Sequence, residues 1–175
     1  MGMYCELRQL NPDYASQLLA DPDRVLHYAE RVESGRLPKA AQGEDLNLDK
    51  AWHGLHYLLT GTAWAGTEPA CYLLAGGEQV GDEEEHDVFG YGPARILMPA
   101  QVAAFNFAVA ALTPAEIELR YQPAEMTRLD IYPGIWERPD EAENNFGFLT
   151  EAAAGLRGFL RRAATQGQAL IIYLA

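Results

Sequence analysis

The sequence predicts an α+β fold, with several helices packed around a small sheet. Three observations lead to this expectation. Helical segments with clear start signals fill most of the chain, the apolar extended segments are few and scattered, and no repeat or linker divides the sequence. A length of 175 residues with a hydrophobic fraction of 49% suits one compact domain over residues 1–175.

Three apolar segments are expected to form strands of one sheet. Residues 3–8 alternate loosely between apolar and polar side chains, residues 94–98 are short and apolar, and residues 169–174 form a continuous apolar run. The last segment is expected to be a fully buried strand, since it offers no polar face.

The helices outside the central segment are marked by their first residues. A polar cap followed by proline occurs at 11–12, 21–22 and 113–114, and Pro99 opens a further helix. A short apolar helix is expected over 70–75. The last helix is expected over 141–165, with Gly167 ending it.

The best-marked helix is expected over residues 46–61 and holds two of the four histidines. Asn47 or Asp49 can cap its start, and Gly61 can end it in a left-handed conformation. Helical spacing predicts a packing face, formed by Ala51, Trp52, Leu55, Leu58 and Leu59. An adjacent polar and aromatic face is predicted from Asp49, His53, His56, Tyr57 and Thr60.

The polar and aromatic face is the candidate site. His53 and His56 are three residues apart, and Asp49 lies one turn before His53, but HxxH lacks the glutamate of HExxH. We therefore expect no metal, and His56 in a pocket or in a buried polar network with Asp49 or Thr60. Acid–base catalysis by His56 with Asp49 and a tyrosine is an alternative, the candidate tyrosines being Tyr57, Tyr91 and Tyr132.

Tryptophans near this helix have two interpretations. Trp52 shares a face with leucines and is expected to be buried, whereas Trp64 lies in a loop and is expected to cover a core or a pocket. Residues 131–136 contain Tyr132 and Trp136, and this short segment is expected to be a turn or extended. These aromatic side chains line a small-molecule pocket in one interpretation and fill the core in the other.

Charge is unevenly distributed along the chain. The net charge is −12, which disfavours nucleic-acid binding because phosphate backbones repel an acidic protein. Residues 1–87 carry 6 basic and 16 acidic side chains, and residues 88–175 carry 7 and 9. The densest acidic run surrounds His86 and is expected to be a solvated loop or a surface for a basic partner, formed by Asp82, Glu83, Glu84, Glu85 and Asp87.

Several classes of protein are disfavoured by the sequence. No apolar run reaches the length of about 20 residues that a membrane helix needs, and no signal peptide is recognisable, so we expect a cytoplasmic protein. Cys5 and Cys71 are too few for a disulfide scaffold and are expected to be buried. No Walker A, GxGxxG or GxSxG motif occurs, and no cofactor is expected.

The chain resembles the YfbM-like family, a bacterial family also called domain of unknown function 1877. The most specific stretch runs from Leu48 to Trp52 and continues through residues 55–56 and 59–61. Weaker stretches follow in the same order at 92–97, 131–136 and 169–173, after the start at 1–3. The resemblance implies a compact α+β domain and no activity, so it supplies no catalytic residues. It draws attention to Asp49, Lys50, Trp52 and His56.

Two functional hypotheses follow. The first is a non-catalytic protein-binding module, of the immunity or antitoxin type, that binds a basic partner through its acidic surface. The second is a small enzyme or a small-molecule-binding protein that uses the His53 and His56 helix face with nearby aromatic side chains.

Overall fold

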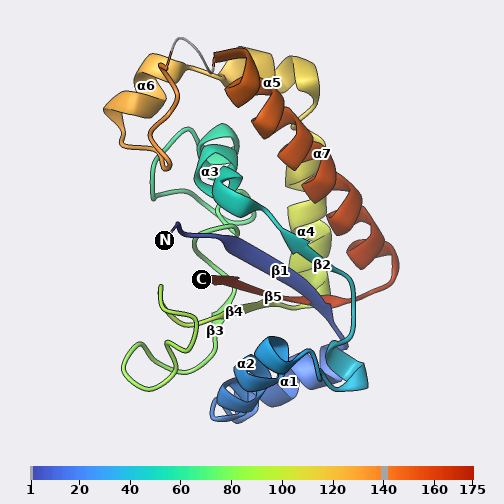
Figure 1. The fold of residues 1–175 in the computed structure, drawn as a ribbon. Helices are drawn as coiled ribbons and strands as arrows, with labels where there is room; N and C mark the ends of the chain where they lie inside the picture. The colour runs from blue at the N-terminus through green and yellow to red at the C-terminus, as the bar shows by residue number, and fades with distance from the viewer. Residues whose placement is uncertain (1, 139–141) are drawn as a thin grey trace.

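The computed structural model describes residues 2–138 and 142–175 and contains one antiparallel sheet with helices on both of its faces (Figure 1). The strand order in the sheet is β2-β1-β5-β4-β3. The strands are β1 (Cys5–Leu10), β2 (Asp45–Asn47), β3 (Glu78–Gln79), β4 (Arg95–Leu97) and β5 (Ala169–Leu174). The helices are α1 (Pro12–Ala20), α2 (Arg24–Ser34), η1 (Lys39–Ala41), η2 (Asp49–Ala51), α3 (Trp52–Thr60), α4 (Pro99–Ala110), α5 (Pro114–Arg120), α6 (Pro123–Arg128) and α7 (Ala142–Thr165).

Strands β1 and β5 carry buried side chains on both faces of the sheet, one face in each of two cores. Along β5, Leu170 and Ile172 belong to the core beneath α3, α4 and α7, whereas Ala169 and Ile171 belong to the core beneath α1 and α2. This alternation follows from the two-residue repeat of a strand. Figure 1 shows the same layers, with α1 and α2 on one side of the sheet and α3, α4 and α7 on the other.

The predicted sheet is confirmed. The segments expected at 3–8, 94–98 and 169–174 contain β1, β4 and β5, and β5 pairs with both of the others. β1 begins at Cys5 and continues to Leu10, two residues beyond its expected end. The short edge strands β2 and β3 were missed, because two or three residues carry no recognisable alternation.

Several predicted helix signals are confirmed. The side chain of Asn11 accepts a hydrogen bond from the Asp13 N–H at the start of α1, and the Thr113 hydroxyl accepts one from the Glu116 N–H at the start of α5. Gly167 follows α7 with a φ of 62°. The expected first residue of that helix, Glu141, lies outside the described residues.

Other helix predictions are wrong in extent or in type. The helix expected over 46–61 is regular only in α3, because Leu46 and Asn47 pair with β1 in β2 and Asp49 has a φ of 47°. The segment 70–75 forms turns, and α2 begins at Arg24, later than the cap expected at 21–22. The sequence analysis did not identify α6.

Arg95 of β4 fixes the turns at 70–76 against the sheet. Its guanidinium donates hydrogen bonds to the carbonyl oxygens of Tyr72, Leu73 and Gly76 at 3.0, 2.7 and 3.1 Å. A charged donor compensates carbonyl groups that no helix would satisfy at this point. One side chain therefore holds a segment that sequence reasoning assigned to a helix.

Among the described residues, no single helix is long and apolar enough to cross a membrane. Only α4 and α5 taken together pass that test, and the pair is bent by 76° between them.

Candidate functional site

The polar and aromatic face that the sequence predicted for α3 is buried, as is its packing face. Its residues from Trp52 to Leu58 are all buried, including both histidines. The predicted burial of Trp52 in the core is confirmed. Gly61, with a φ of 72°, ends the helix as expected. Around α3, the loop 61–67, the turn 131–134 and the N-terminal segment supply the surroundings of the histidines.

Both ring nitrogens of His53 take part in hydrogen bonds. Its Nε2 lies 2.7 Å from the carbonyl oxygen of Ala63, and its Nδ1 lies 2.9 Å from the backbone N of Tyr132. The carbonyl can only accept and the backbone N–H can only donate, so Nε2 carries the proton and Nδ1 accepts. Burial lowers the pKa of His53. A neutral imidazole thus joins two segments that lie far apart in the sequence.

Two tryptophan rings pack against His53, and a tyrosine ring stacks on one of them. The Trp52 ring lies parallel to it at a centroid distance of 4.9 Å, and the Trp64 ring lies tilted against it at 4.3 Å. On Trp52, the ring of Tyr132 stacks at 5.6 Å. Trp64 remains 62% exposed, in contrast to the fully buried Trp52. The predicted loop tryptophan therefore covers the histidine and keeps one part of its indole in solvent.

The N-terminal segment closes one side of this cluster. The backbone N–H of Met3 donates to the hydroxyl of Tyr132 at 3.1 Å, and the indole N–H of Trp52 donates to the carbonyl of Met3 at 3.2 Å. Beside these contacts lies a pocket of about 380 Å³ that we name the aromatic pocket. It is lined chiefly by Met3, His53, Trp64, Asp130, Tyr132 and the turn 133–134.

His56 lies in the core and does not line the aromatic pocket. Its Nε2 donates to the carbonyl of Ala65 at 3.0 Å, and its Nδ1 has no hydrogen-bond partner among the described residues. Burial lowers the pKa of His56 to about 4. The sequence suggested a pocket or a buried polar network of His56 with Asp49 or Thr60. The Thr60 hydroxyl bonds to the main-chain carbonyl of His56, and Asp49 takes no part.

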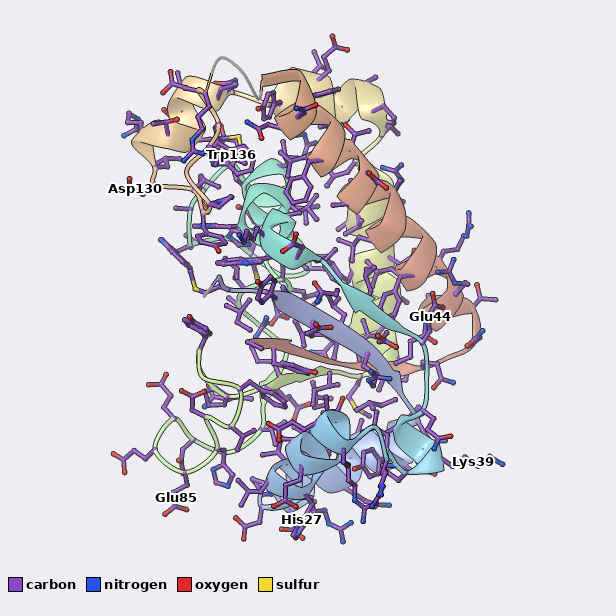
Figure 2. All side chains as sticks on the ribbon, in the orientation of Figure 1. His27, Lys39, Glu44, Glu85, Asp130 and Trp136 are labelled. Atoms are coloured by element: carbon purple, nitrogen blue, oxygen red, sulfur yellow. The ribbon has the colours of Figure 1, made fainter. Side chains whose placement is uncertain are left out.

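The remaining predicted site residues lie apart from this pocket. Asp49 is exposed and borders a shallow groove between β2 and α7. Trp136 is buried, donates its indole N–H to the carbonyl of Ile131 at 2.6 Å and belongs to the core (Figure 2). The sequence also grouped Tyr57 and Tyr91 as partners for His56, but neither lines the aromatic pocket.

The acidic run forms a folded loop in which some carboxylates bond to the loop backbone and others do not. Asp82 accepts hydrogen bonds from the backbone N–H groups of Glu84 and Glu85, and Asp87 accepts from those of Gly90 and Gly92. These two side chains hold the loop backbone. The side chains of Glu83, Glu84 and Glu85 are left exposed, and Figure 2 shows Glu85 at the outer edge of the molecule.

His86 anchors the acidic loop to Asp23, the residue that precedes α2. It is 6% exposed, its Nδ1 accepts a hydrogen bond from the Asp82 N–H at 3.2 Å, and its Nε2 lies 3.4 Å from a carboxylate oxygen of Asp23. Ligand atoms of Asp82, Glu85 and His86 lie within 4.8 Å of one another. Both ring nitrogens of His86 already have partners, so this grouping is explained by the anchoring of the loop.

A second, larger cavity lies at the opposite end of β1. It measures about 720 Å³ and is lined mainly by carboxamide side chains, among them Gln9, Asn11, Gln42 and Gln168. We name it the polar cavity. The sequence analysis missed it, because these glutamines are scattered over 160 positions and share no spacing.

The sequence analysis also missed Met3 and Asp130 as lining residues of the aromatic pocket, and Ala63 as the hydrogen-bond acceptor of His53. One signal was present for Asp130, since it directly precedes the aromatic segment 131–136 that was singled out. Its φ of 52° is uncommon for a residue other than glycine, and no pattern in the sequence predicts it. The contacts of Met3 and Ala63 are made by backbone atoms, which side-chain patterns do not reveal.

Comparisons with known proteins identify the family from the sequence and a similar fold from the structure. The family model described as domain of unknown function (DUF1877) matches residues 1–173. The structure is similar to the crystal structure of a protein of unknown function, YfbM from Escherichia coli, with a TM-score of 0.72 and 19% sequence identity over 98% of this chain and 99% of that chain. None of the curated proteins matches the chain.

Proposed function

This chain belongs to the DUF1877 family, as its resemblance predicted, and on that premise we propose that it is a non-catalytic binding protein that holds its ligand in the aromatic pocket. One observation carries the proposal. Trp64 keeps 62% of its surface in solvent although His53 fixes its ring at the border of the pocket. A large aromatic side chain held in place at a pocket supplies contact area at a low cost in conformational entropy.

The hydrogen bonds of His53 favour binding over acid–base catalysis. A general base needs a nitrogen that can reach a substrate proton. The backbone groups of Ala63 and Tyr132 occupy both nitrogens of His53. His56 is fully buried and does not line the pocket, so it cannot contact a substrate placed there. We place this binding in the cytoplasm, where the free cysteines Cys5 and Cys71 stay reduced.

Fragment binding followed by NMR tests the proposal. We expect small amine and aromatic fragments to shift the backbone signals of Met3 and Gly134 together with the indole N–H signal of Trp64. The variant Trp64→Phe identifies the indole signal, and Trp64→Ala should abolish the shifts while the remaining spectrum stays folded. Fragments that shift only residues of the polar cavity, such as Gln42 and Gln168, would refute a ligand site at Trp64.

The acidic loop supports a second candidate function, the binding of a basic protein partner. The observation in favour is that different carboxylates of the loop have different roles. Asp82 and Asp87 hold the backbone, so Glu83, Glu84 and Glu85 stay exposed in a fixed arrangement. Like charges presented together raise the association rate with an oppositely charged partner. An immunity or antitoxin protein that caps a basic toxin is one protein of this kind.

Association rates at low and high salt test the second candidate. A partner isolated from the native host should associate more slowly at high salt, and more slowly with the triple variant Glu83→Gln, Glu84→Gln, Glu85→Gln. The matched control neutralises Asp13, Glu30 and Glu33, which are three other acidic residues of the same half. Equal slowing by both triple variants would attribute the effect to net charge and remove the role of the loop.

A further inference from the structure

We propose that the ligand of the aromatic pocket is an organic cation, an alkylammonium group carried by a small amine or by a lysine side chain. The inference rests on the proposed function, since it names the ligand class for the same pocket. Three features of the pocket support it: two aromatic rings with fixed positions, one exposed carboxylate, and a described lining that contains neither lysine nor arginine.

The aromatic rings offer faces that attract cations. The ring of Trp64 is fixed on His53 and remains largely exposed, and the ring of Tyr132 is fixed on Trp52. A cation above an indole or phenol ring is stabilised by the negative charge of the π face, and tryptophan is the strongest partner. Both rings are already ordered by their contacts, so a ligand does not need to order them.

Asp130 supplies the negative charge. It is exposed at the end of α6, and Figure 2 shows it at the outer edge of the molecule on the same side as the turn before Trp136. Its backbone is held in the left-handed region at a φ of 52°. The backbone N–H of Asp130 donates to the carbonyl of Thr127 at 3.1 Å. Asparagine adopts this conformation as readily as aspartate, so the carboxylate can be neutralised without altering the turn.

The other walls add no positive charge. His53 is neutral because its two nitrogens hold one proton between Ala63 and Tyr132. Lys50 is not among the lining residues, although its side chain lies next to Gly2 on the side of the Tyr132 hydroxyl. The chain as a whole carries a net charge of −12, which attracts cations and repels anions over a longer range. An anionic ligand would meet Asp130, and the described lining of the pocket contains no basic side chain to compensate for its charge.

The volume fits a small ligand. About 380 Å³ is near the lower end of the usual range for small-molecule sites, about 300–1,000 Å³. A trimethylammonium head group with a short chain, or the end of a lysine side chain, is a ligand of this size class. A large polycyclic ligand would require the surrounding segments to move.

A pair of probes with the same shape isolates the charge. Choline and 3,3-dimethyl-1-butanol differ in the replacement of the quaternary nitrogen by carbon. We expect choline to shift the indole N–H signal of Trp64 and to bind about tenfold more tightly than the alcohol, a difference typical of cation–π contacts. Equal affinities would overturn the cation inference and leave the proposed ligand pocket in place, whereas no binding of choline would overturn the inference alone.

Two aspartates give a matched pair of variants. Asp130→Asn should weaken choline binding about tenfold and leave binding of the alcohol unchanged. Asp49→Asn is the control, because Asp49 is also exposed and left-handed, with a φ of 47°, but lies outside the pocket. Equal weakening by both variants would overturn the assignment of Asp130. Tighter binding of a trimethyllysine peptide than of choline would indicate that the natural ligand is a lysine side chain of a protein. Tighter binding of choline would indicate a free amine. Either result supports the inference of a cationic ligand.

Discussion

The imidazole of His53 lies against the indole of Trp64, with their ring centroids 4.3 Å apart. The same imidazole binds the carbonyl of Ala63 next to that tryptophan and the backbone N–H of Tyr132, which is 79 residues further along the chain. The histidine therefore connects α3 to the Trp64 loop and to the turn at 131–134. Because these segments form the aromatic pocket, the stability of the pocket depends on the two hydrogen bonds of His53.

Replacing His53 by phenylalanine should destabilise the protein, because the two hydrogen bonds of the imidazole are lost. The variant keeps an aromatic ring but leaves the partly buried Ala63 carbonyl and Tyr132 N–H without their partner, at a cost of about 1–3 kcal/mol for each group. We expect the free energy of unfolding to fall by about 2–4 kcal/mol in chemical denaturation. The control is His27→Phe, whose side chain is 76% exposed, and it should change stability by less than about 0.5 kcal/mol. An equal effect of both variants would contradict the role of His53.

His56 should make the protein less stable in mild acid. Its pKa is about 4 in the folded protein, below the ordinary value of 6.5, so between these values the unfolded chain binds the extra proton. Its contribution to stability is complete above about pH 6.5 and is lost as the pH falls towards 4, amounting to about 3 kcal/mol over that window.

Denaturation curves between pH 7 and pH 5.5 check this prediction, since most carboxylates do not yet titrate there. The variant His56→Gln, whose amide can still donate to the Ala65 carbonyl, should show a smaller loss of stability with falling pH. The exposed His27→Gln serves as the reference and should keep the wild-type slope. Identical slopes for His56→Gln and the wild type would show that another group causes the acid sensitivity.

Gly54 in the middle of α3 should not tolerate alanine. A Cβ atom there would lie 2.7 Å from a methyl carbon of Leu149 and 2.9 Å from the indole of Trp136, both in the core. Overpacking of this kind costs about 1–3 kcal/mol, which exceeds the gain of about 1 kcal/mol in helix propensity. The control is Gly155→Ala in α7, where the nearest atom lies 3.8 Å away, and it should raise the melting temperature. A higher melting temperature for Gly54→Ala as well would show that the side chains around α3 can rearrange to accommodate the methyl group.

Arg95 should be required for the turns at 70–76. Arg95→Met removes hydrogen bonds to the carbonyls of Tyr72, Leu73 and Gly76, and we expect a loss of about 2–4 kcal/mol together with faster amide exchange in that segment. Arg128→Met removes an ion pair with Glu125 that is open to solvent, and it should leave the free energy of unfolding nearly unchanged. Unchanged exchange in the Arg95 variant would mean that other contacts hold these turns.

The elements that the sequence predicted well are those whose signals are local. Asn11 before Pro12, Thr113 before Pro114 and Gly61 after α3 all act at their own position in the chain. The apolar run 169–174 was recognised as a buried strand for the same reason, since burial on both faces leaves a continuous apolar segment. The family and the α+β class followed from such stretches.

Tertiary contacts decided what local patterns could not. Residues 46–47 lie within a helical pattern, but pairing with β1 satisfies their backbone groups and gives β2. The periodicity of α3 predicted a packing face and a polar and aromatic face, and the tertiary structure buries the residues of both faces from Trp52 to Leu58.

The sequence by itself thus determined the fold class, the helix caps and the residue types of the candidate site. Only the tertiary structure decided that His53 belongs to a pocket with Trp64, Tyr132 and Asp130, while His56, Trp136 and Asp49 do not. The physical reason is that the pocket is joined by hydrogen bonds to the backbone of Met3, Ala63 and Tyr132. Every residue carries the same backbone groups, so these partners leave no pattern in the sequence.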